Sequence, residues 1–138
     1  MALNDFQIVQ HFNLREFQCR CCGQVKIGHD LVFTMEELRK KLNLPVRVVS
    51  GYRCPNYNVV VGGAKDSYHI EGRASDIAAA TDLNTICRAA KELGLRGIGK
   101  YPDENYVHID NREKECYWVK HKNKPYKYMS FEEMIKSK

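Results

Sequence analysis

The chain has 138 residues, six cysteines and a net charge of +5, a length typical of one domain, which we expect to span residues 1–138. Its longest apolar stretches, such as residues 59–61 and 77–80, are far shorter than the roughly 20 residues of a transmembrane helix, so we expect no membrane insertion. The first twelve residues lack the basic flank and apolar run of a signal peptide, which predicts synthesis in a cytoplasm.

The first part of the chain contains two predicted helices and a strand. Asn13 and Glu16 have the spacing of a capping box, which predicts a short helix over LREF. Between Asp30 and Leu42, apolar residues recur at helical spacing and predict a longer helix. The β-branched run VRVV predicts a strand, and a loop is expected after it.

The second part contains three more predicted strands and a helix. The apolar segment ASDIAAA is typical of a buried strand. Asp82 is expected to cap a helix that stops at Gly94. The runs GIGKY and NYVHID predict two strands separated by a turn.

The C-terminal segment has two features. Ser130 and Glu133 again have capping-box spacing and predict a terminal helix over FEEMIK. The preceding segment KHKNKPYKY is basic and aromatic, but basic residues elsewhere are dispersed, so we do not expect a nucleic-acid partner. Mixed helices and strands without regular alternation predict an α+β domain on an antiparallel or mixed sheet with flanking helices.

Three residues have the chemistry of a catalytic zinc site. His69 and Asp76 are seven residues apart with Gly72 between them, so a turn can bring the imidazole and the carboxylate together. His108 comes from a separate predicted strand. Catalytic zinc typically has three protein ligands of these types and leaves a position for water, whose pKa it lowers toward neutrality.

These residues belong to a wider pattern. The motif S-x-H-x-x-G-x-A-x-D spans residues 67–76, with S-G-Y-R upstream at residues 50–53 and H-x-D at residues 108–110. In order and spacing, the chain resembles the zinc D-alanyl-D-alanine carboxypeptidases, a family that includes the L-alanyl-D-glutamate endopeptidases of phage lysins. The similarity extends from the segment HFNLREFQC to about Tyr117.

The resemblance implies a hedgehog-like α+β fold and a zinc ion bound by His69, Asp76 and His108. It implies a peptidase that cleaves peptidoglycan stem peptides, of the D-Ala-D-Ala carboxypeptidase or the L-Ala-D-Glu endopeptidase type. In such a family, a single domain without a signal peptide is typical of a phage or prophage lysin that acts after release from the cell, and we expect a monomer. Arg53 is expected near the substrate, since its guanidinium can hold a carboxylate or a developing oxyanion. Ser67 is expected to bind the substrate backbone or to orient a ligand.

The general base is the missing part of the pattern. Family members often have an acid or histidine three residues before the last ligand, where this chain has Asn105. The nearest carboxylates are Asp103 and Glu104. If the strand extends back to them, Glu104 lies on the face of His108, whereas Asp103 points away unless the turn at Pro102 redirects it, so we favour Glu104 and keep Asp103 as the alternative base. Without a base, the chain would be a non-catalytic zinc-binding module of the hedgehog type.

The cysteines allow several interpretations. Cys19, Cys21, Cys22 and Cys54 could bind a structural zinc ion, but C-x-C-C brings its sulfurs closer than the usual C-x-x-C spacing. We therefore favour disulfides formed after release, or buried thiols, for these four residues. Cys87 is expected in the core, because a free cysteine packs as a small hydrophobic residue.

Overall fold

The computed structural model describes residues 3–138. The N-terminal part consists of a small antiparallel pair, β1 (Gln7–Val9) and β2 (Phe12–Asn13), followed by the 3-10 helix η1 (Leu14–Phe17) and helix α1 (His29–Leu42). Asn13 and Glu16 form the predicted capping box of η1. Both helices predicted in this part are therefore confirmed.

A six-stranded mixed sheet forms the centre of the molecule. Its strands are β3 (Val46–Ser50), β4 (Ala74–Ala79), β5 (Gly97–Tyr101), β6 (Tyr106–Asp110), β7 (Cys116–Val119) and β8 (Lys127–Met129). The strand order is β3-β4-β6-β5-β7-β8, and every pairing is antiparallel except that of β5 with β7. The α+β prediction with a mixed sheet is thus confirmed.

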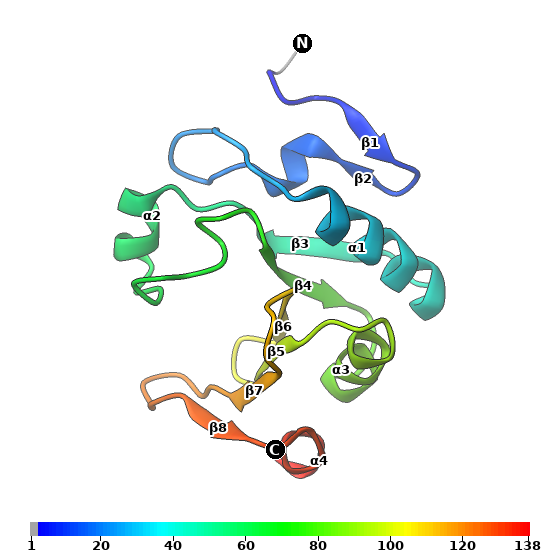
Figure 1. Cartoon of the computed structure of the whole chain (residues 1–138), viewed down its shortest axis with the longest axis vertical. Coiled ribbons are helices and arrows are strands. Elements are labelled where there is room, and N and C mark those ends of the chain that lie inside the picture. Colours follow the sequence, from blue (N-terminus) through cyan, green and yellow to red (C-terminus); the bar gives the residue numbers. More distant parts are fainter. Residues whose placement is uncertain (1–2) are drawn as a thin grey trace.

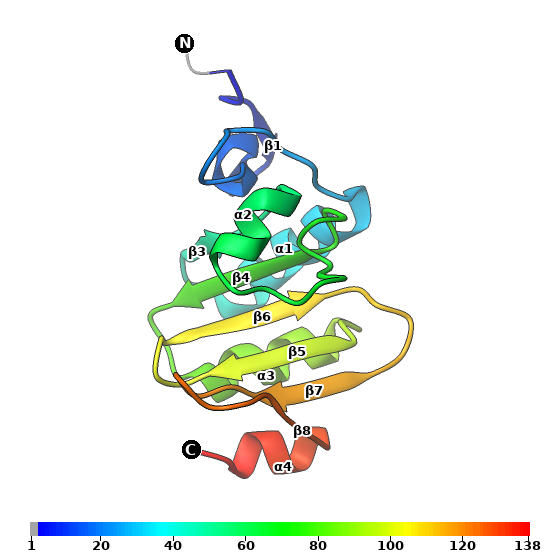
Figure 2. The ribbon, with the colours of Figure 1, turned by 90° about the vertical axis from the view of Figure 1, so that its left-hand side faces the viewer.

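The two faces of this sheet are different. Helices α1 and α3 (Leu83–Glu92) cover one face, whereas α2 (Pro55–Val60) lies on the opposite side (Figures 1 and 2). The side chains between the sheet and its covering helices form the apolar core, which includes Ile77, Ile98, Val107 and Ile109. Helix α4 (Phe131–Lys136) lies beyond β7 and closes the far end of the molecule.

Strand register aligns the residues of the other face. Asp76 on β4 is opposite His108 on β6, which is opposite Gly99 on β5, which in turn is opposite Trp118 on β7. Because side chains alternate between the two faces of a strand, the flanking apolar residues point to the helices while this row points away. The fold therefore places two predicted zinc ligands side by side on the face that α1 and α3 leave uncovered.

Several elements differ from the sequence-based expectation, which contained no strand at β1, β2 or β7. Helix α2 lies in the segment predicted as a loop, and β8 begins in the last two residues of the basic segment and ends at Met129. Strand β6 begins at Tyr106, because Asn105 has a left-handed backbone with φ of 59°. It therefore does not extend back to Glu104, and the premise used to orient that side chain is wrong.

One histidine has a partner that the sequence did not indicate. The His11 ring and its backbone N–H both bind the carboxylate of Glu36, a buried residue of α1. Burial raises the pKa of Glu36, but the hydrogen bonds and charge of His11 outweigh this and lower the pKa overall. This ion pair fastens the β1–β2 turn to α1.

Within residues 3–138, no helix is long and apolar enough to cross a membrane.

Candidate metal centre

His69, Asp76 and His108 converge in the structure as predicted. Asp76 and His108 come from adjacent strands, whereas His69 comes from the loop between α2 and β4. All three side chains are buried. Each offers a ligand atom, and these atoms all lie within 4.8 Å of one another.

The spacing of these atoms fits a zinc ion. The distance from His69 Nε2 to Asp76 Oδ1 is 3.2 Å, that from His69 Nε2 to His108 Nδ1 is 3.3 Å, and that from His108 Nδ1 to Asp76 Oδ1 is 3.1 Å. Zinc binds nitrogen and oxygen at about 2.0–2.1 Å in a tetrahedron, whose edges are then about 3.3–3.4 Å. The three donors therefore form one face of such a tetrahedron.

Further hydrogen bonds fix which nitrogen of each imidazole faces this centre. His69 Nδ1 donates to the carbonyl oxygen of Gly51 at 2.8 Å, which leaves Nε2 free to bind a metal. His108 Nε2 donates to Asp110 Oδ2 at 2.7 Å, which leaves Nδ1 free. Arg112 holds the same carboxylate through two N–H groups, at 2.6 and 2.8 Å. Such outer partners orient the ligands of protein metal sites.

The groups around Asp76 and Asp110 favour the ionised form of both carboxyl groups. Burial raises the pKa of Asp76, but the charge and hydrogen bonds of His69 and His108 hold that pKa far below its usual range. Asp110 is likewise buried, and its bonds with Arg112 and His108 lower its pKa. Both carboxyl groups are therefore ionised at neutral pH, the state in which a carboxylate binds zinc or supports a ligand.

Arg53 contacts Asp76, one of the three candidate metal ligands, directly. Its Nη2 donates to Asp76 Oδ2 at 3.0 Å, its Nε donates to Ser50 Oγ and its Nη1 donates to Asn58 Oδ1. These bonds use three of the five N–H groups of a guanidinium and leave two for another partner. Arg53 thus orients Asp76, a role that the sequence did not indicate, and it also lines the neighbouring pocket.

A pocket of about 360 Å³ opens beside the three ligands. Its wall includes Ser67 from the loop that carries His69, and the Ser67 hydroxyl accepts a hydrogen bond from the His69 backbone N–H at 3.2 Å. The lining also includes Lys120, Tyr126 and Tyr128. The segment that was considered for nucleic-acid contact therefore forms part of this pocket.

The carboxylates near the pocket fall into two groups. Glu104 lines it, together with Asp66, which the sequence had not singled out. Asp103 instead accepts hydrogen bonds from His121 Nδ1 and from the Lys122 backbone N–H. The two adjacent carboxylates therefore differ in their surroundings, since only Glu104 lines the pocket. Glu104 stays the predicted base, with Asp66 as a second candidate, and Asp103 loses its geometric support.

Two glycines of β5 leave space for site side chains. A Cβ atom on Gly97 would collide with the Asp110 carboxylate, and one on Gly99 would collide with the Trp118 ring. Trp118 in turn lies next to His108, with ring centroids 5.0 Å apart. The two glycines of GIGKY are therefore needed to make room for side chains of the site. The sequence alone did not indicate this role.

Part of the chain is similar in sequence to peptidoglycan L,D-endopeptidases of several bacteria. The probable peptidoglycan L,D-endopeptidase MepK of Haemophilus influenzae is 36% identical over 74 residues, 49% of this chain and 40% of that protein. The peptidoglycan L,D-endopeptidases MepK of Escherichia coli K12 and Shigella flexneri are each 40% identical over 72 residues, 48% of this chain and 40% of those proteins. The matches thus span less than half the length of each relative.

The family profile described as Peptidase M15 matches residues 10–110. This range contains His69, Asp76 and His108, together with Arg53 and Asp110. It covers most of the chain and agrees with the resemblance found in the motifs. The chain belongs to the Peptidase M15 family.

Proposed function

We propose that the chain is a zinc peptidase that hydrolyses an amide bond in the stem peptide of peptidoglycan. The observation that carries this proposal is the set of three buried donors, spaced at 3.1–3.3 Å, beside an open pocket. The names of the MepK relatives favour cleavage of the L,D-endopeptidase type over removal of a terminal D-alanine.

The residues of the chain have separate tasks in this reaction. A zinc ion on His69, Asp76 and His108 would polarise the scissile carbonyl and make water acidic enough to attack. Glu104 or Asp66, which line the pocket, would accept the proton of that water and return it to the leaving amine. The two free N–H groups of Arg53 would bind a negative oxygen of the substrate or of the intermediate.

The pocket suits an anionic peptide. Stem peptides carry free carboxylates, and the pocket wall supplies cationic groups from Arg53, Arg112 and Lys120. Tyrosine and tryptophan side chains between them offer flat apolar surface to the peptide backbone. The lysin role, with action on the wall after release and as a monomer, rests on the family resemblance.

Digestion of purified cell walls tests the proposal. Zinc-loaded protein is incubated with wall fragments and with soluble stem peptides, and the products are identified by mass spectrometry. We expect cleavage between an L- and a D-residue, with no product from His69→Ala. If fully zinc-loaded protein releases nothing from any substrate, the non-catalytic zinc module becomes the better interpretation.

A further inference from the structure

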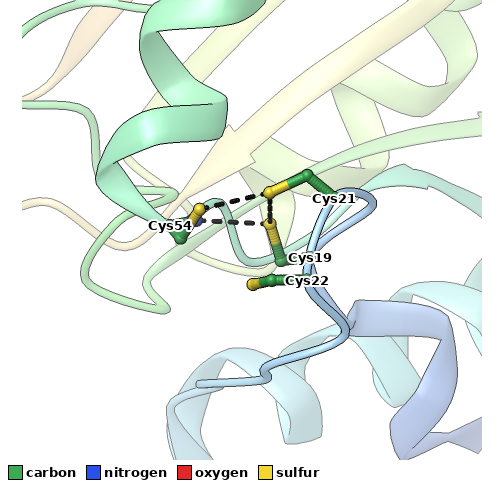
Figure 3. Close-up of side chains that lie close together, drawn as sticks. All are labelled: Cys19, Cys21, Cys22 and Cys54. Carbon is green, nitrogen blue, oxygen red and sulfur yellow. Dashed lines mark hydrogen bonds between the residues drawn. The ribbon is translucent and has the colours of Figure 1, made fainter.

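Four cysteines converge at a second place in the molecule. Cys19, Cys21 and Cys22 lie in the loop after η1, whereas Cys54 precedes α2 and is 32 residues further along the chain than Cys22. Their sulfur atoms all lie within 4.8 Å of one another. Figure 3 shows Cys19 and Cys21 directed toward Cys54, with the Cys22 side chain next to Cys19.

The loop has a shape that overcomes the crowding expected for C-x-C-C. The Cys19 N–H donates to the Gln24 carbonyl at 2.7 Å, and the Gly23 N–H donates back to the Cys19 carbonyl at 2.9 Å. Gly23 has φ of 74°, a left-handed conformation that glycine adopts without strain. The resulting tight turn brings the side chains of three closely spaced cysteines to one side.

The sulfur distances match a metal-thiolate site. Cys19 Sγ and Cys21 Sγ are 3.6 Å apart, and Cys21 Sγ and Cys54 Sγ are 3.4 Å apart. A tetrahedron with zinc–sulfur bonds of about 2.3 Å has edges of about 3.8 Å. A disulfide bond needs about 2.05 Å, and all six cysteines of the chain are free.

Backbone donors point at two of these sulfur atoms. The Cys54 N–H donates to Cys19 Sγ at 3.4 Å, and the Tyr57 N–H donates to Cys54 Sγ at 3.4 Å. N–H groups placed in this way stabilise the negative charge of a thiolate, the form that binds metals. Cys21 and Cys22 are exposed, so the prediction of buried thiols is wrong for these two, and an ion can enter from solvent.

We propose that Cys19, Cys21, Cys22 and Cys54 bind a structural zinc ion. Four protein ligands fill the tetrahedron and leave no position for water, which distinguishes this site from the catalytic centre. Each thiol releases its proton to solvent as the ion binds. No oxidant is required, and no sulfur–sulfur bond forms.

This second ion would support the first site. Cys54 directly follows Arg53, the residue that holds Asp76. Two residues before Cys19 and Cys54, the Phe17 carbonyl accepts a hydrogen bond from the Tyr52 N–H at 2.8 Å, so the two segments already lie side by side. A zinc ion between them would fasten the start of the active-site loop to the N-terminal part of the chain.

Cobalt substitution tests the proposal without relying on activity. Cobalt bound to several thiolates gives intense ligand-to-metal charge-transfer absorption, whereas cobalt bound to histidine and carboxylate does not. The protein is purified under reducing conditions, as wild type and as the His69→Ala/His108→Ala variant, which lacks two of the three proposed catalytic ligands. We expect the variant to bind about one cobalt or zinc ion per chain, with the charge-transfer band.

Matched cysteine variants complete the experiment. Cys21→Ser/Cys22→Ser in the same background should lose both the ion and the band, whereas Cys116→Ser, outside the cluster, should retain them. Alkylation should reach the four thiols only after a chelator removes the ion. The proposal is overturned if no band forms, if all four thiols react equally without the chelator, or if non-reducing mass spectrometry finds them joined as disulfides. Failure of the wall-digestion assay would leave it intact.

Discussion

Replacement of Arg53 by lysine tests whether Arg53 orients Asp76, one of the three candidate metal ligands. In the structure, the Arg53 guanidinium donates to Asp76, Ser50 and Asn58 at 3.0, 3.2 and 3.3 Å. Lysine retains the positive charge but cannot reproduce a planar group with several donors. Asp76 would then lose the hydrogen bond that fixes the oxygen turned away from the metal centre.

The size of the effect follows from that lost bond. Removing an outer partner of a metal ligand typically costs about 10–100-fold in metal affinity or activity. This corresponds to about 1.4–2.8 kcal/mol, since each tenfold change is about 1.4 kcal/mol. A hydrogen bond to a charged group contributes about 1.5–3 kcal/mol, so loss of the Arg53–Asp76 bond alone accounts for this range.

Two measurements separate the two roles of Arg53. Zinc affinity, measured by competition with a coloured chelator, reports the support of Asp76, while KM and kcat on a stem peptide report substrate contact. Arg73→Lys is the matched control, because Arg73 is bound to Asn111 and does not line the pocket. If Arg53→Lys changes neither zinc affinity nor turnover relative to Arg73→Lys, the assignment of Arg53 to the site is wrong.

Three further predictions concern the metal, the base and the N-terminal ion pair. His108→Ala should remove the zinc of the catalytic centre. Metal analysis is done on protein that carries Cys21→Ser/Cys22→Ser but keeps His69, so that only this centre can hold an ion, and retention of the ion would exclude His108 as a ligand. Glu104→Gln should lower kcat by about 10²–10⁴-fold without loss of zinc, whereas Asp103→Asn, bound away from the pocket, should keep near wild-type rates; equal effects would contradict the geometry. The hydrogen bonds and charge of His11 lower the pKa of Glu36 in the folded protein. The ionised Glu36 carboxylate therefore stabilises the fold above the pKa of an unfolded glutamate, about 4.3. This stabilisation is lost as the pH falls through the folded pKa. Urea unfolding should therefore show Glu36→Gln less stable than wild type by about 1–3 kcal/mol at pH 7, a difference that shrinks below about pH 4 and that would not change with pH if the pair were unimportant.

Local features of the sequence determined several elements of this protein. A capping box satisfies free N–H groups at a helix start through residues only three positions apart, so the helices after Asn13 and Ser130 were predictable without any tertiary contact. The three candidate metal ligands could likewise be selected from the sequence, because zinc sites typically use those residue types and the motif contains them in order. Zinc binding itself, and the reaction, remain predictions.

Tertiary structure decided the surroundings of those ligands. The strand order brings residues from β4, β6, β5 and β7 into one row, and this pairing depends on contacts distant in the chain. Arg53 contacts Asp76 across 23 positions, and the basic segment after Trp118 becomes a pocket wall only because β8 pairs with β7.

The choice between the carboxylates of Asp103 and Glu104 also depended on the tertiary structure. Asp103 and Glu104 are adjacent in sequence, and strand periodicity could favour one of them only by assuming how far β6 extends. In the structure Asn105 has a left-handed backbone just before β6 begins, and Asp103 accepts a hydrogen bond from His121 whereas Glu104 lines the pocket. Likewise, the spacing of C-x-C-C argued against a metal site, but a turn at Gly23 and the distant Cys54 bring four sulfur atoms together. Sequence spacing limits which side chains can meet, and the three-dimensional path of the chain decides which of them do.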